Sequence, residues 1–278
     1  MLSFLRTWQP DILVLHSANR IQTLLCLQER IPGAHYILYS NSAATRGIVL
    51  DEIARHHDIV SASIFKARII RDRFCRQTGY PIERTRVFPS GIDVDKFRPA
   101  PVEKDLDCVW VGFLRKNNYR KKNVAMLMEV FSSLEGRLHI VGKGEMASKL
   151  RRMAPANVTF LGFIAHSELP QVLVRCKVGV HPSLFDPCPR AVSETLACGL
   201  PVIGLKEGLG TEDQILDAVN GYRVDTPAEM QSAIQKLLAD ETLRRQMGSE
   251  SRGIAETRFN VDVIAQELEL FLQEVASS

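Results

Sequence analysis

The sequence of 278 residues lacks the features that mark several classes of protein. Its six cysteines form no C-x-x-C pair, which favours reduced, cytosolic thiols over a disulfide framework. No apolar run is long enough to cross a bilayer, and residues 1–14 are interrupted too often by polar residues for a signal peptide or a membrane span. Low-complexity tracts and clear internal repeats are also absent. We therefore expect a cytoplasmic protein made of ordinary globular domains.

The charges of the chain are nearly balanced. A formal net charge of +3 is too small to indicate a nucleic-acid partner, and we expect none. His139, His166 and His181 have no partners at the spacing of metal ligands, so no metal site is predicted. The length, with 45% hydrophobic and 24% charged residues, suits one large or two small domains.

Short apolar runs alternate with amphipathic stretches in the first part of the chain, which predicts a parallel sheet with crossover helices. The expected strands are residues 12–15, 36–39, 58–61 and 86–88, and the expected helices are residues 18–30, 43–56 and 63–78. Residues 88–99 then form a stretch rich in turn residues that fits neither a helix nor a strand.

The second part of the chain repeats this alternation and therefore predicts a second α/β unit. The expected strands are residues 108–112, 138–142, 158–162, 178–181 and 201–204, and the expected helices are residues 123–134, 145–153, 167–176 and 189–198. A glycine-rich turn follows at 207–212, and residues 220–224 resemble a hairpin. Residues 227–257 indicate two helices, and 260–275 a last one.

The most informative stretch is D-P-C-P-R-A-V-S-E, from Asp186 to Glu194. Pro189 suits the first position of a helix, because its ring fixes φ and its missing N–H costs nothing there. The amides of Arg190, Ala191 and Val192 would then be free to bind a phosphate. If Asp186 precedes the helix and Glu194 lies one turn inside it, both carboxylates face one cleft.

This D-x7-E stretch, followed by A-C-G-L-P-V, resembles the E-x7-E signature of retaining GT-B glycosyltransferases of family four. Residues 88–99 also resemble the P-N-G-I-D…F…P connector of that family, with Ser90 in the place of Asn. The resemblance implies an α/β fold of GT-B type with two Rossmann-like domains, of which the N-terminal one is truncated. We place an acceptor-side domain at 1–100, a donor domain at 101–257, and a helix at 258–278 that crosses back.

The resemblance also implies roles for residues around the donor, a nucleotide-diphosphate sugar. Glu194 would accept hydrogen bonds from the ribose, and Asp186, where most members have Glu, would lie near the transferred sugar. Lys122 matches the family lysine that binds the diphosphate, and Arg115 or Arg120 would replace an arginine that is absent after Gly112. The remaining donor-binding residues are expected to be Gly142, Gly144, Gly162, Phe163, Cys188, Pro189, Arg190 and Ala191.

The acceptor side matches the family less well. The chain starts at a strand well inside the family's first domain, and Ser40 and Asn41 stand where a histidine is expected. Either side chain could bind a sugar hydroxyl, and His16 is a further candidate beside the acceptor. A partner chain that completes this domain would account for the missing strands.

Residues 63–78 combine apolar residues with five basic ones. Such a helix can lie on an anionic membrane surface, although a core-packed helix with a basic outer face is the favoured interpretation. In the former case the protein is peripheral to the inner face of the membrane.

Three functions are compatible with these observations. The leading hypothesis is a retaining, metal-independent glycosyltransferase without a cofactor that transfers a sugar to a glycan, a lipid-linked acceptor or a small molecule. Basic residues and helix amides would stabilise the leaving diphosphate. The alternative is a non-catalytic nucleotide-sugar-binding protein, or a subunit completed by another chain. A related GT-B enzyme such as a nucleotide-sugar epimerase ranks third.

Overall fold

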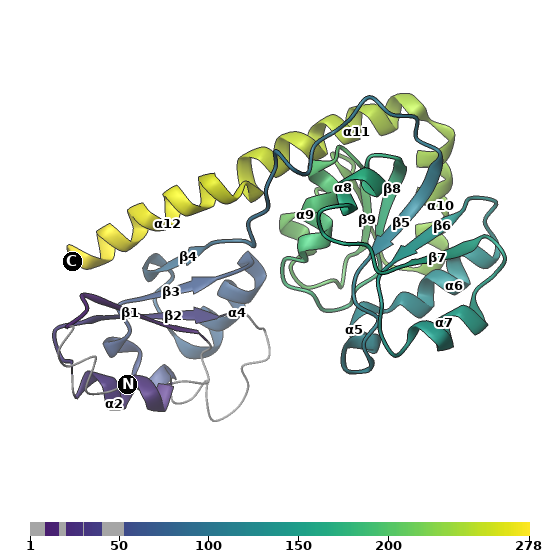
Figure 1. Cartoon of the computed structure of the whole chain (residues 1–278). Coiled ribbons are helices and arrows are strands. Elements are labelled where there is room, and N and C mark those ends of the chain that lie inside the picture. Colours follow the sequence, from purple (N-terminus) through teal and green to yellow (C-terminus); the bar gives the residue numbers. More distant parts are fainter. Residues whose placement is uncertain (1–8, 17–20, 30, 41–52) are drawn as a thin grey trace. The chain divides into compact units, whose positions relative to one another are not determined.

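The computed structural model describes residues 9–16, 21–29, 31–40 and 53–278. The chain divides into two compact units (Figure 1). One unit comprises residues 1–89 together with 262–278, and the other comprises residues 90–261. No helix within the described ranges is both long enough and apolar enough to cross a membrane.

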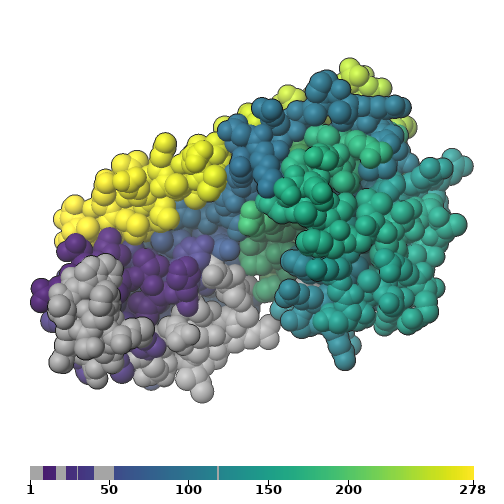
Figure 2. All heavy atoms as spheres, in the orientation of Figure 1, coloured from purple at the N-terminus to yellow at the C-terminus, as the bar shows by residue number. Residues whose placement is uncertain are grey.

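The first unit contains a parallel sheet in the order β1-β2-β3-β4. Its strands are β1 (Ile12–His16), β2 (His35–Ser40), β3 (Ala62–Phe65) and β4 (Thr85–Val87), and its helices include α2 (Ile21–Gln28) and α4 (Arg68–Thr78). The last helix of the chain, α12 (Val261–Ala276), packs Ile264, Phe271 and Val275 against buried side chains of this sheet. Figure 2 shows α12, in yellow, along the unit that it covers.

The sequence placed one strand and one helix of this unit too early. Residues 57–59 form a short 3-10 turn, and the strand begins only at Ala62, four residues later than expected. All four residues of β3 are buried between β2 and β4, so residues 63–65 belong to the sheet and not to a helix. Most of the predicted helix 43–56 lies outside the described residues.

The second unit contains a six-stranded parallel sheet in the order β10-β9-β8-β5-β6-β7. The strands are β5 (Leu106–Val111), β6 (Leu138–Val141), β7 (Val158–Gly162), β8 (Cys176–His181), β9 (Val202–Leu205) and β10 (Gly221–Val224). Numbered within the unit this order is 3-2-1-4-5-6, that of a doubly wound sheet, in which ligands bind where the order reverses. The reversal lies between β5 and β8, and it positions the site described below.

Helices that connect these strands or follow the last one lie on both sides of the sheet (Figure 1). They are α5 (Tyr119–Lys122), α6 (Val124–Ser132), α7 (Ala147–Met153), α8 (Leu169–Leu173), α9 (Arg190–Ala197), α10 (Pro227–Ala239) and α11 (Glu241–Ile254), followed by a π-helical turn at 255–259. Residues 220–224 do not form a hairpin, because Gly221–Val224 pairs parallel to β9. The α/β fold with two parallel sheets, the N-terminal one smaller, is confirmed.

Candidate functional site

The carboxyl ends of β5 and β8 bring together a cation and a carboxylate that are distant in the sequence. Lys122 ends α5, which follows β5, whereas Asp186 lies in the loop between β8 and α9. The Lys122 ammonium forms an ion pair with Asp186 Oδ2, and the two side chains are only 21% and 20% exposed. The Leu184 amide also donates to the Lys121 carbonyl at 2.8 Å, which fixes the loop against α5. The structure therefore unites two of the predicted site residues.

His181, the last residue of β8, lies beneath this ion pair. Its Nε2 is 3.8 Å from Asp186 Oδ2 and forms no hydrogen bond with any described residue. Burial, together with the charge of Lys122, lowers the pKa of His181 to about 3, although the charge of Asp186 opposes this shift. The imidazole is therefore neutral beside a charged pair.

The start of α9 presents free backbone amides next to Asp186. Pro189 is the N-cap of the helix, with ψ of 119°, and not its first residue as predicted, so the helix begins one residue later, at Arg190. The Val192 amide donates to the Pro189 carbonyl at 3.0 Å. The prediction that this amide is free to bind a phosphate is therefore wrong. The amides of Arg190 and Ala191 form no hydrogen bonds with described residues. Two donors thus point out of the helix start, where an anion is stabilised.

Buried polar contacts hold this helix start in place. Gln214 Nε2 donates to the Pro189 carbonyl at 3.0 Å and to Ser193 Oγ at 2.6 Å. Cys188 is buried with a φ of +72°, and its Sγ accepts a hydrogen bond from the Ser90 amide. These contacts anchor both sides of Pro189.

Glu194 lies in the first turns of α9 and is only 4% exposed. Its Oε1 is 2.8 Å from His166 Nε2 and 3.7 Å from the Arg190 guanidinium, one turn earlier. A buried carboxylate is stable only when it is paired or hydrogen-bonded, and these two side chains meet that need. Sequence reasoning missed His166, which meets Glu194 only through the tertiary fold, and His181, which ends the strand five residues before Asp186.

Glycines allow the loops after β5 and β6 to pack closely. A Cβ on Gly142 would lie 1.8 Å from the Gly112 carbonyl oxygen, and one on Gly144 would lie 2.3 Å from that of Leu114. Both glycines have a positive φ. Gly162, at the end of β7, has open space beside it, and the following Phe163 side chain is 58% exposed. The backbone at Gly162 is therefore not covered by other side chains, and an exposed aromatic ring follows it.

The two arginines proposed as replacements do not reach the carboxylates. The Arg115 guanidinium stacks 4.7 Å from the centre of the Phe113 ring. Arg120 is exposed on α5 and forms no ion pair with a described residue. Among the described lysine and arginine side chains, Lys122 is the one that pairs with Asp186, and Arg190 is the one that comes within 4 Å of Glu194.

On the first unit, the described acceptor candidates lie at one edge of the sheet. His16 ends β1 with its ring centre 4.9 Å from that of Tyr39, and Ser40 ends the neighbouring strand β2. His16 is exposed, whereas Ser40 is buried. Asn41 lies outside the described residues.

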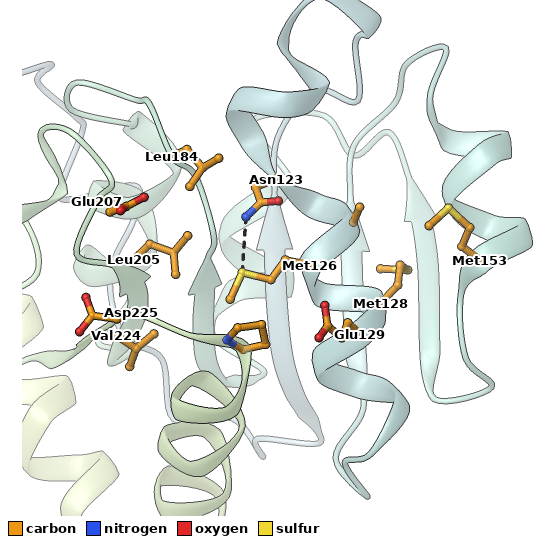
Figure 3. Close-up of a pocket in the computed structure, with 12 residues that line it drawn as sticks. Asn123, Met126, Met128, Glu129, Met153, Leu184, Leu205, Glu207, Val224 and Asp225 are labelled. Atoms are coloured by element: carbon orange, nitrogen blue, oxygen red, sulfur yellow. Dashed lines mark hydrogen bonds between the residues drawn. The ribbon is translucent and has the colours of Figure 1, made fainter.

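A separate groove of about 730 Å³ runs beside α6 (Figure 3). Apolar side chains such as Met126, Leu205 and Val224 line it, and carboxylates stand around it at Glu129, Glu207 and Asp225. None of the predicted donor-binding residues lines this groove. Its carboxylates would repel a diphosphate. Among the described residues, no three His, Cys, Asp or Glu side chains gather as metal ligands would.

Comparison with known sequences gives the family of the chain. Residues 95–253, more than half of the chain, match the family described as "Glycosyl transferases group 1". Over 92% of its own length, the chain is 30% identical to spore coat protein SA of Bacillus subtilis. Over 66% of its own length, it is 27% identical to a GDP-mannose-dependent monoacylated alpha-(1-6)-phosphatidylinositol monomannoside mannosyltransferase of Corynebacterium glutamicum. It spans 76% of the former protein but only 55% of the latter.

Solved structures agree in fold. Anabaena Alr3699/HepE in complex with UDP superposes with a TM-score of 0.84, at 18% identity, over 98% of this chain and 80% of that one. A sucrose-phosphate synthase from Thermosynechococcus elongatus gives a TM-score of 0.81 at 20% identity, over 99% and 76% of the two chains. At such identities the likeness establishes the GT-B fold alone. On the evidence of the matched residues, this chain belongs to the glycosyl transferases group 1 family.

Proposed function

We propose that the chain is a retaining glycosyltransferase that moves a sugar from a nucleotide-diphosphate sugar to an acceptor hydroxyl without a metal ion. The observation that carries the proposal is the arrangement around the loop between β8 and α9. Lys122 and the free amides of Arg190 and Ala191 flank this loop, and Glu194 lies buried just behind it. These groups suit a diphosphate with a ribose beside it.

In this proposal each residue has a defined task. The bond between the sugar C1 and the phosphate oxygen breaks, and the acceptor oxygen bonds to C1 on the same face. The acceptor proton passes to the leaving phosphate, so no protein base is needed. Lys122 and the α9 amides stabilise the charge that the diphosphate gains, and Glu194 binds the ribose.

The donor and acceptor are proposed as chemical classes. Relatives are named for GDP-mannose, and a similar structure contains UDP, so both nucleotides belong in a donor screen. The acceptor is a glycan, a lipid-linked molecule or a small molecule with a free hydroxyl. The apolar residues Ile70 and Phe74 of α4 are buried in the core and cannot enter a membrane. Contact of α4 with an anionic membrane would therefore depend on its exposed basic residues Arg68 and Arg76.

The test begins with thermal unfolding in the presence of GDP-mannose, UDP-glucose and UDP-N-acetylglucosamine, since ligand binding to the folded state raises the midpoint. The stabilising donor is then incubated with the protein, with and without EDTA, and release of the nucleoside diphosphate is measured. We expect EDTA-resistant turnover that falls about 100-fold in Glu194→Gln and an α-linked product by NMR from an α-linked donor. Glu129→Gln, a carboxylate on α6 outside this site, is the matched control.

The alternative is a non-catalytic nucleotide-sugar-binding protein or a subunit that requires a partner chain. It is favoured by the end of β2, where Ser40 and not an imidazole follows Tyr39. Strong stabilisation by a nucleotide sugar, with no turnover on any acceptor or on water, would support this alternative and contradict the transferase.

A further inference from the structure

The buried carboxylate of Glu194 is held at one oxygen only. His166 Nε2 and the Arg190 guanidinium both approach Oε1, at 2.8 Å and 3.7 Å. Among the described residues, no hydrogen bond reaches Oε2. A carboxylate fixed in this way keeps its orientation while it offers the second oxygen to a ligand.

His166 is itself fixed by the segment that precedes β5. Lys96 Nζ lies 3.2 Å from His166 Nδ1, and the Phe97 ring centre is 5.1 Å from that of the imidazole. An ammonium group can only donate hydrogen bonds, so Nδ1 accepts a hydrogen bond from Lys96. The other nitrogen, Nε2, then carries the imidazole hydrogen and donates a hydrogen bond to Glu194. Lys96 thus selects the tautomer that Glu194 requires.

The turn that carries Lys96 is well supported. Asp93 Oδ1 accepts hydrogen bonds from the amides of Asp95 and Lys96 at 3.1 and 2.9 Å. Arg252 Nη1 donates to the carbonyls of Val94 and Phe97 at 2.8 and 2.7 Å. A continuous set of contacts therefore leads from this turn through His166 to the carboxylate.

We propose that His166 is a positioning residue that orients Glu194 toward the vicinal hydroxyls of the nucleotide ribose. This inference rests on the proposed function, because it assumes that Glu194 faces a ribose. The imidazole does not touch the ligand in this scheme. It holds Oε1 so that Oε2 is aligned before the nucleotide arrives, which reduces the ordering that binding requires.

The experiment compares a nucleoside diphosphate with its 2′,3′-dideoxy analogue by isothermal titration calorimetry, using UDP or GDP according to the donor screen. The variants are His166→Ala, His166→Gln and the control Ser167→Ala, whose side chain is exposed. We expect the wild type to prefer the ribose form, and His166→Ala to lose about tenfold in affinity for that form. The affinity for the dideoxy form should not change. Glutamine, which retains an N–H donor, should restore most of the preference, and Ser167→Ala should behave as the wild type.

Each other outcome contradicts a defined part of the proposal. An equal loss for both ligands in His166→Ala would show a merely structural role, and a gain for the ribose form would show that His166 competes with the ligand. If the wild-type protein binds both ligands equally, the site does not recognise the ribose hydroxyls, although it still binds the nucleotide. Wild-type protein that binds neither ligand would overturn the proposed function itself.

Discussion

Lys122 and Asp186 form an ion pair across the point where the strand order of the second sheet reverses. The two residues are 64 positions apart in the sequence and come from opposite sides of the switch point. Each charge satisfies the other. A diphosphate would compete with Asp186 for the ammonium, so the pair marks where the phosphate charge would be received.

The first prediction separates a structural ion pair from a functional lysine. We expect Lys122→Met to lower kcat/KM for donor turnover about 100- to 1,000-fold, because it removes a cation aimed at the leaving group. The double variant Lys122→Met with Asp186→Asn should remain as inactive as the lysine variant. Lys121→Met is the matched control, since that ammonium lies 5.3 Å from the Phe185 ring centre and pairs with no carboxylate of the described residues.

A purely structural pair would behave differently in this cycle. Replacing both charges would then restore activity, because neither partner would be left buried and unpaired. Activity of the double variant close to that of the wild type would therefore contradict the role of Lys122.

The second prediction concerns the stability of the fold in acid. Burial lowers the pKa of His181 to about 3, from the ordinary value of 6.5 for a histidine. Between these two pH values the unfolded chain binds a proton that the folded chain does not, so stability decreases as the pH falls. The slope due to this one group reaches about 1.4 kcal/mol per pH unit.

Urea unfolding of the wild type and His181→Gln between pH 7.5 and about pH 4.5 measures this effect. The variant should be less stable than the wild type at pH 7.5, because a buried side chain has been changed, and the gap should narrow as the pH falls. Parallel curves would show that His181 titrates normally in the folded protein.

The sequence predicted most of the second sheet because its strands are short, continuous apolar runs. Residues 138–141 form β6 within the expected run, and all four are buried, since strands covered on both faces of a sheet need no alternation. The strand near residue 60 was misplaced because Ile59 and Val60 resemble a strand but belong to the turn before it. The buried run of β3 that follows was read as helical together with Ile69 and Ile70.

Apart from Lys122, which the family resemblance indicated, the site was predictable only where its residues are neighbours in the chain. Asp186, Pro189 and Glu194 lie in one short segment, and their spacing on the loop and helix could be inferred. The partner of Glu194, by contrast, lies 28 residues away on the loop after β7. A lone histidine carries no local signal of such a contact. Arg115 stacks on its neighbour Phe113, and its contact with a diphosphate stays a prediction.

The third prediction contrasts two glycines. A Cβ at Gly142 would lie 1.8 Å from the Gly112 backbone, and the φ of +142° disfavours any other residue. Gly142→Ala should therefore lower the free energy of unfolding by at least about 3 kcal/mol. Gly253 lies within α11 with nothing within 4 Å of a Cβ, so Gly253→Ala should raise it by up to about 1 kcal/mol. Urea unfolding at pH 7.5 checks both, and equal effects would contradict the packing of the Gly112 loop.

The fourth prediction concerns Arg252, which connects three segments of the second unit. Its Nη1 donates to the carbonyls of Val94, Phe97 and Ala197 at 2.8, 2.7 and 3.0 Å. Arg252→Met leaves these carbonyls without that donor, and we expect the free energy of unfolding to fall by about 2–4 kcal/mol. Lysine should recover only part of this loss, because it lacks the planar fork of donors.

Arg245 provides the matched control for this variant. Its side chain is 81% exposed and, within the described part of the chain, pairs only with Glu241, one turn earlier on α11. Arg245→Met should therefore change stability by no more than about 0.5 kcal/mol. Because Arg252 also braces the turn that carries Lys96, Arg252→Lys should reduce the preference for a ribose-containing nucleotide. Calorimetry with the ribose and dideoxy ligands measures this preference. An Arg252→Lys variant that is destabilised but keeps its full ribose preference would show that the turn does not need this brace to hold His166.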